Sequence, residues 1–77
     1  MIKNLIETIA KSLVDYPEEV EVKEVKGDHT IVFELSVAKE DLGKVIGKQG
    51  KTALAIRWLV SATATKQKLR AHLEIIE

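Results

Sequence analysis

Val45-Ile46-Gly47-Lys48-Gln49-Gly50-Lys51 determines the architecture, because two glycines three residues apart separate two segments of helical periodicity. Gly47 can take a positive φ and end the first helix at no steric cost. Gly50 lacks a Cβ where the second helix begins, so another backbone can approach it. The first amides of that helix have no intrahelical partners and carry the positive end of its dipole, which favours an anion. Lys48, Lys51 and Lys44 add positive charge there, and a sugar-phosphate backbone fits this description.

Three helices are predicted. Apolar residues recur every three or four positions from Ile2 to Val14, which indicates an amphipathic helix, and Tyr16-Pro17 should end it. A short helix before Gly47 would line up Leu42, Val45 and Ile46. The run from Lys51 to about Thr65 is apolar around much of its circumference, so we expect that helix to be buried on more than one side.

Alternating apolar residues predict three strands, around residues 20–23, 31–37 and 69–75. The first two flank the turn Gly27-Asp28 and should form an antiparallel hairpin. The expected order is α-β-β-α-α-β, a two-layer α+β fold in which three helices cover one face of a three-stranded sheet. A right-handed crossover should make the last strand parallel to the second. We expect residues 1–77 to form one domain.

The amino-acid composition of the chain excludes several classes of protein. Apolar residues make up 45% and charged residues 31% of the 77, which is typical of a globular protein. The chain has no cysteine, so we expect no disulfide and no thiolate metal site, and a cytoplasmic location is favoured. No apolar run is long enough to predict a membrane span.

The zero net charge conceals a division between the two halves. Residues 1–41 carry five lysines against ten acidic residues, and residues 42–77 carry seven basic residues against two acidic ones. Such asymmetry is typical of a local polyanion site, although chance segregation on a solvated surface explains the charges about equally well.

Val45-Ile46-Gly47-Lys48-Gln49-Gly50 resembles the Val-Ile-Gly-X-X-Gly segment of the KH domain family. The element order resembles the prokaryotic, type II arrangement of that family over essentially the whole chain. The resemblance implies a loop that clamps the backbone of about four single-stranded nucleotides. Among KH proteins, the chain is most similar to the small stand-alone bacterial ones. This implies an RNA chaperone or post-transcriptional regulator that forms a homodimer, or a heterodimer with a larger KH-containing protein.

The resemblance also implies a base-binding groove beside the loop, lined by the two central helices, the last strand and the variable loop before it. That loop is placed at about Thr65 to Lys68, and its shortness argues against strong base specificity. Leu54 could equally belong to the core. The expected RNA-binding residues are Lys44, Ile46, Gly47, Lys48, Gln49, Gly50, Lys51, Leu54, Lys68 and Arg70, with Lys66 and Leu69 near the bases.

Several side chains have plainer interpretations. Trp58 and Phe33 occupy apolar positions of their elements, so core packing is favoured over base stacking. Arg57 is interpreted as a solvated arginine. His29 and His72 have no companions at metal-ligand or catalytic spacing, so both are interpreted as surface residues. We therefore expect no metal, no cofactor and no catalytic activity.

Two alternative functions remain. A KH fold could serve protein interaction alone, through the mixed outer face of its sheet, although such a protein would have no need for a lysine in the loop. A phosphate-loop nucleotide-binding protein is the enzymatic alternative, because Gly50-Lys51-Thr52 matches the end of a Walker A motif. That motif requires glycine at position 45, where this chain has Val, and it follows a strand rather than a helix.

Overall fold

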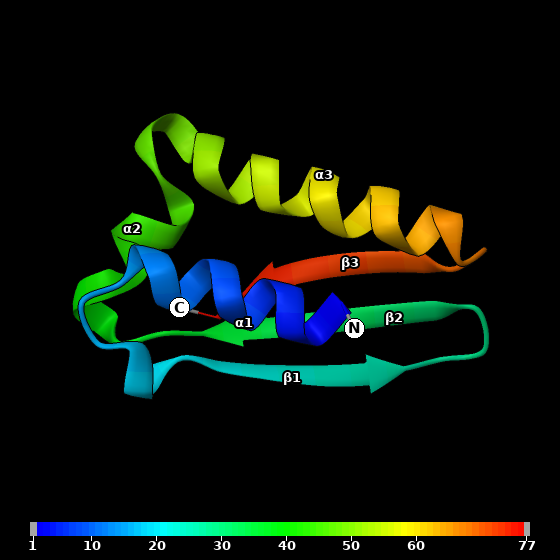
Figure 1. Cartoon of the computed structure of the whole chain (residues 1–77), viewed down its shortest axis with the longest axis horizontal. Helices are drawn as coiled ribbons and strands as arrows, with labels where there is room; N and C mark the ends of the chain where they lie inside the picture. The colour runs from blue at the N-terminus through cyan, green and yellow to red at the C-terminus, as the bar shows by residue number, and fades with distance from the viewer. Residues whose placement is uncertain (1, 77) are drawn as a thin grey trace.

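The computed structural model of the protein describes residues 2–76 and has the expected order of elements. They are α1 (Ile2–Leu13), β1 (Glu21–Lys26), β2 (Thr30–Ser36), α2 (Leu42–Ile46), α3 (Lys51–Lys66) and β3 (Arg70–Ile75). The helices lie on one side of the sheet, and α3 runs along β3 (Figure 1). This is the predicted two-layer α+β arrangement.

The sheet has the order β1-β2-β3. β1 and β2 pair antiparallel, with Lys23 opposite Glu34, as the predicted hairpin requires. β3 pairs parallel to β2, with Phe33 beside Leu73, which confirms the crossover through α2 and α3. β2 is therefore the central strand, and each outer strand has one free edge.

The core lies between the sheet and the helices. Phe33 and Leu35 of β2 are fully buried, so the prediction of core packing for Phe33 is confirmed. The alternation of β2 follows from the strand period of two, which sends every second side chain toward the helices. The other buried apolar residues are Ile2, Ile6 and Ala10 of α1, Val22 of β1, Val45 of α2, Ala53, Ile56, Val60 and Ala64 of α3, and Ala71 and Leu73 of β3.

The expectation for α3 was wrong in one respect, because the helix is buried on one side only. Trp58, interpreted as a core residue, has 72% of its surface exposed, and Leu54 has 51%. The exposed apolar residues of the outer face are Leu54, Ala55, Trp58, Leu59 and Ala62, which we call the α3 apolar band. The helix carries more apolar residues than the sheet can cover, and composition alone does not reveal which of them face outward.

α3 ends at Lys66, within one residue of the expected end at about Thr65, and the variable loop is a short turn. The amide of Leu69 donates to the carbonyl of Ala64, and the amide of Lys68 donates to the carbonyl of Thr65. This is a Schellman motif, in which the residue at the position of Lys68 adopts a left-handed conformation and is usually glycine. Lys68 takes that conformation, with φ of 61°.

Candidate nucleic-acid interface

The loop between α2 and α3 depends on the missing side chain of Gly47. This residue ends α2 with φ of 77°, and its amide donates to the carbonyl of Gly43 at 2.9 Å. A Cβ at this position would lie 2.8 Å from the backbone nitrogen of Thr52 and closer still to the Thr52 side chain. Gly47 therefore allows the chain to fold back tightly onto the first turn of α3.

Gly50 has a different role, because it faces open space. It caps α3 with φ of 74°, yet a Cβ added to it would meet no atom within 4 Å. The missing side chain leaves room at the N-terminus of α3, where no side chain caps the helix. Between the glycines, Gln49 also has a positive φ, of 57°. Non-glycine residues rarely adopt this conformation, and those that do are concentrated at functional sites.

Lys48, Gln49 and Lys51 are exposed around this opening. Lys44, in contrast, is already paired with carboxylates. Its ammonium lies 3.1 Å from a carboxylate oxygen of Asp15 and 3.2 Å from Oδ1 of Asp41. Because one lysine is shared by two carboxylates, this cluster carries a net negative charge, and the positive potential at the loop comes mainly from Lys48 and Lys51.

The pKa values of Asp41 and Lys44 are both shifted by the groups around them. Burial raises the pKa of Asp41, but the hydrogen bonds from the amides of Asp15 and Tyr16 and from Lys44 outweigh burial, so the pKa of Asp41 lies below its usual 3.8. The hydrogen bond to Asp15, followed by that to Asp41, raises the pKa of Lys44 above its usual 10.5. Both groups are therefore charged near neutral pH.

A second surface lies where α3 runs along the free edge of β3. The amides of Arg70 and Ile76 donate to β2 and the residue before it, so in a parallel ladder the backbone groups of Ala71 and Leu73 point the other way. Arg57 contacts this edge of β3, since its Nε donates to the carbonyl of Leu73 at 3.4 Å. Arg57 is thus exposed but tied to β3, which the sequence did not indicate.

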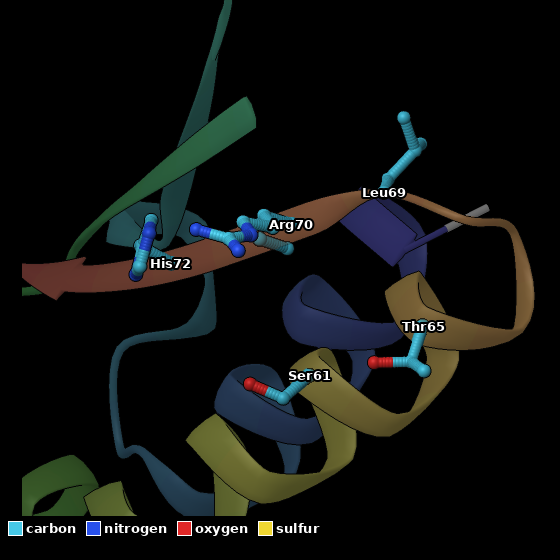
Figure 2. A pocket seen from close by; sticks show the side chains of 6 residues that line it. Ser61, Thr65, Leu69, Arg70 and His72 are labelled. Atoms are coloured by element: carbon cyan, nitrogen blue, oxygen red, sulfur yellow. The ribbon is translucent and has the colours of Figure 1, made fainter. Parts of the chain in front are cut away.

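Figure 2 shows a pocket of about 170 Å³ at this edge, with side chains of Ser61 and Thr65 on α3 and of Arg70 and His72 on β3. Leu69 and Ala71 complete its lining. Sequence reasoning identified Arg70 and Leu69 but missed the two hydroxyls, because serine and threonine in a helix carry no pattern that distinguishes a groove from plain surface.

The structure brings the predicted site residues together in two groups, at the two ends of α3. Ile46 is half-buried behind the loop, and the loop residues and Lys51 cluster at the N-terminal end. Lys66, Lys68 and Arg70 are at the other end, where all three are exposed. A helix of this length spans about 24 Å. Leu54 lies between the two ends, and the pocket, which Arg70 lines, adjoins the C-terminal end.

Within residues 2–76, no cluster of three or more His, Asp or Glu side chains is placed to hold a metal ion. Over the same residues no helix combines the length and apolar character needed to cross a bilayer. His72 is exposed, as expected.

The fold and the Gly-X-X-Gly loop between α2 and α3 define a type II KH domain. A crystal structure of Aquifex aeolicus Era bound to GDP and AlF4⁻ has the same fold, with a TM-score of 0.65 at 20% sequence identity. The alignment covers 96% of this chain and 29% of the Era chain, so the chain corresponds to a part of Era.

Comparison with the sequences of known proteins identifies the family more narrowly. The model of the KhpA/KhpB KH domain matches residues 3–75. The RNA-binding protein KhpA of Clostridium acetobutylicum is 60% identical over 74 residues, which are 96% of this chain and 99% of that protein. KhpA of Chlamydia pneumoniae is 55% identical over 75 residues, 97% of this chain and 96% of that protein. The chain therefore belongs to the KhpA/KhpB KH domain family.

Proposed function

We propose that this protein binds single-stranded RNA and that the Gly47-Lys48-Gln49-Gly50 loop grips the sugar-phosphate backbone. The observation that carries the proposal is the open space at Gly50, next to an uncapped helix N-terminus and two exposed lysines. Backbone amides and lysines of this kind suit a phosphate. The relatives, which are named RNA-binding proteins, support the same assignment.

The RNA strand would continue from the loop over the exposed flank of α3 that carries Leu54, toward the pocket beside the free edge of β3. Ile46 and Leu54 supply aliphatic contacts to bases near the loop, and Lys68 and Arg70 meet phosphates at the far end. The pocket between Ser61, Thr65 and Arg70 offers hydroxyls and a guanidinium to a base or a ribose. Lys44 contributes less than Lys48 and Lys51, because its ammonium is already shared by two carboxylates.

We assign the chain a non-catalytic role, as an RNA chaperone or post-transcriptional regulator acting in the cytoplasm as one KH domain over residues 1–77. A binding site made of backbone amides, lysines and aliphatic side chains holds RNA without a nucleophile or a general base. With so few cations near the loop, roughly three or four phosphates would be contacted, so affinity should be modest and mildly dependent on salt.

The test is the double variant Lys48→Asp with Gln49→Asp. We expect a loss of about 100-fold or more in affinity for a fluorescein-labelled single-stranded RNA, because the reversed charges repel phosphate. The matched control is Lys3→Asp with Asn4→Asp, which makes the same change of charge on the exposed first turn of α1. The control should bind RNA almost as the wild type does, and circular dichroism should be unchanged for both variants. Equal RNA affinity in wild type and loop variant would overturn the site.

A second copy of the chain is the partner that the α3 apolar band fits best. Between Lys51 and Lys66 the helix has a single charged residue, Arg57, and that side chain is bonded to Leu73. Depletion of charge around aromatic and aliphatic residues is characteristic of interface centres. Trp58 and Leu59 lie at the midpoint of α3, so two antiparallel copies could pair through Ala55, Leu59 and Ala62, the part of the band farthest around the helix axis from Leu54. A larger KH-containing protein could present an equivalent helix to the same band.

Leu59 separates this proposal from RNA binding, because it lies well over 100° around the helix axis from Ser61 and Thr65, at about 100° per residue. Leu59→Glu should convert a dimer into a monomer in sedimentation equilibrium and leave the RNA affinity of each domain within about threefold. A wild type that is monomeric at about 100-fold higher concentration than the RNA assay requires would contradict homodimerisation. Binding of a larger KH-containing protein that Leu59→Glu abolishes would assign the band to the heterodimer.

A further inference from the structure

Asp41 is the one charged residue that is fully buried within residues 2–76. It immediately precedes α2, and its carboxylate accepts three hydrogen bonds. The amide of Asp15 donates to Oδ1 at 3.1 Å, and the amide of Tyr16 donates to Oδ2 at 3.0 Å. Lys44 donates to Oδ1 from one turn further along. Every buried polar side-chain atom within residues 2–76 has a partner, so neither oxygen of the carboxylate is unpaired.

These bonds determine where α2 can lie. A helix of five residues has no stability of its own, so its position must come from tertiary contacts. Val45 anchors one side of α2 in the core. Asp41 anchors its beginning to the segment that follows α1, and Gly47 then continues from its end. Apolar packing of α2 against the core and the carboxylate of Asp41 therefore set the orientation of the Gly47–Gly50 loop together, and the bonds of Asp41 are the polar, directional part.

Lys44 completes the same arrangement rather than facing solvent alone. It joins the buried carboxylate of Asp41 to the exposed carboxylate of Asp15, whose side chain is 71% exposed. A buried carboxylate requires a cationic partner or several hydrogen bonds, and here it has both. The ammonium of Lys44 is thereby held at the start of α2.

We infer that Asp41 is a positioning residue for RNA binding, which holds α2 so that the loop is already in its gripping geometry before RNA arrives, with Lys44 as its counterion. The inference rests on the proposed function. Preorganisation of this kind increases affinity because no ordering of the loop has to accompany binding. Neither residue needs to touch RNA to have this effect.

The main test compares Asp41→Asn with Asp15→Asn. The first substitution keeps the shape of the buried side chain but removes its charge and one acceptor oxygen, whereas the second leaves both amide bonds to Asp41 in place. At a temperature where circular dichroism shows full folding, Asp41→Asn should weaken binding of a labelled single-stranded RNA about tenfold, and Asp15→Asn should change it by less than about twofold. Amide hydrogen exchange in Asp41→Asn should accelerate in residues 43–52 and remain slow in β2.

Lys44→Met supplies an arm that does not depend on Asp41→Asn folding. Removing a counterion of Asp41 should lower RNA affinity without changing the slope of log affinity against log salt, and its effect should not add to that of Asp41→Asn. If Lys44 instead bound a phosphate, Lys44→Met would reduce the slope of log affinity against log salt, and its effect would add fully to that of Asp41→Asn. Reduced slope with full additivity, or wild-type affinity in both single variants, would overturn the inference.

The exchange arm separates this inference from the proposed function. If wild-type protein bound no RNA, the proposed function would fail, while faster exchange confined to residues 43–52 in Asp41→Asn would still assign the positioning of the loop to Asp41. A uniform increase of exchange across β2 and α3 would show that Asp41 serves global stability only, and would overturn the positioning role.

Discussion

The two ends of α3 reach left-handed backbone conformations in different ways. At the N-terminal end, Gly47 and Gly50 supply two of the three positive φ values, and their missing side chains allow tight folding and an open surface. At the C-terminal end Lys68 occupies the position usually filled by glycine. The first end gives up side chains so that a ligand backbone can approach, and the second end retains a charged side chain at a cost in backbone strain.

The largest expected effect distinguishes the two glycines. Gly47→Ala should destabilise the protein by roughly 3 kcal/mol, because a positive φ and overlap with Thr52 both oppose a Cβ. Gly50→Ala should cost only about 1 kcal/mol, since the φ is unfavourable but the space is empty. Urea unfolding of both variants measures the difference. Equal destabilisation would mean that the loop relaxes around the methyl group added at position 47 and that the close approach to Thr52 is not required.

Acid should loosen the N-terminal end of α3 before the C-terminal end. The folded-state pKa of Asp41 is lowered, so its stabilising contribution is present above the unfolded value of 3.8 and is lost as pH falls through the lower folded-state pKa. Lys44 has a raised pKa, so its contribution is full below 10.5 and is lost only at higher pH. As the pH is lowered below about 3.8, hydrogen exchange should therefore increase in residues 43–52 before it increases around Gln67 to Leu69. Simultaneous loosening of both ends would contradict a local role for Asp41.

Lys68→Gly removes both the backbone strain and one positive charge at the C-terminal end of α3. We expect a gain of about 0.5–1 kcal/mol in the free energy of unfolding, because glycine adopts the left-handed conformation without the usual penalty. RNA affinity should fall at the same time, by about threefold, with the loss of one phosphate contact. A more stable variant with unchanged RNA affinity would remove Lys68 from the proposed interface and leave its conformation without a functional reason.

The smallest effect concerns salt. Each lysine that neutralises one phosphate of single-stranded RNA contributes about 0.7 to the slope of log affinity against log salt. Lys48→Ala and Lys68→Ala should each reduce the slope by that amount if the RNA spans both ends of α3. A reduction at Lys48 alone would confine the RNA to the loop.

Local patterns predicted the elements that local physics determines. The alternation of β2 identified its buried face because one side of the sheet is covered by helices, and Gly47 marked the end of α2 because the turn requires a positive φ. The candidate site residues of the loop were found for the same reason, since both glycines and both lysines lie within one short segment.

The missed features depend on distant partners. Asp41 gave no signal because the amides that it binds lie 26 and 25 residues earlier in the chain. Trp58 was assigned to the core because an apolar helix position does not say whether a sheet or another molecule covers it. The left-handed conformation of Lys68 could not be predicted either, because lysine is not among the residues that usually indicate a left-handed cap.

β3 pairs in parallel with β2, so Thr30 pairs with Arg70, which lies far along the chain from it. This pairing cannot form until Arg70 has been synthesised. During synthesis from the N-terminus, the hairpin and the loop at Gly47 are both made before the strand on which α3 packs. Until β3 arrives, Ile56 and Val60 lack part of the surface that they cover, and contacts between such distant segments form late in folding. A nascent chain would thus contain the complete Gly-X-X-Gly segment before the loop can bind RNA. The loop would reach its binding geometry only after β3 has been synthesised and has joined the sheet.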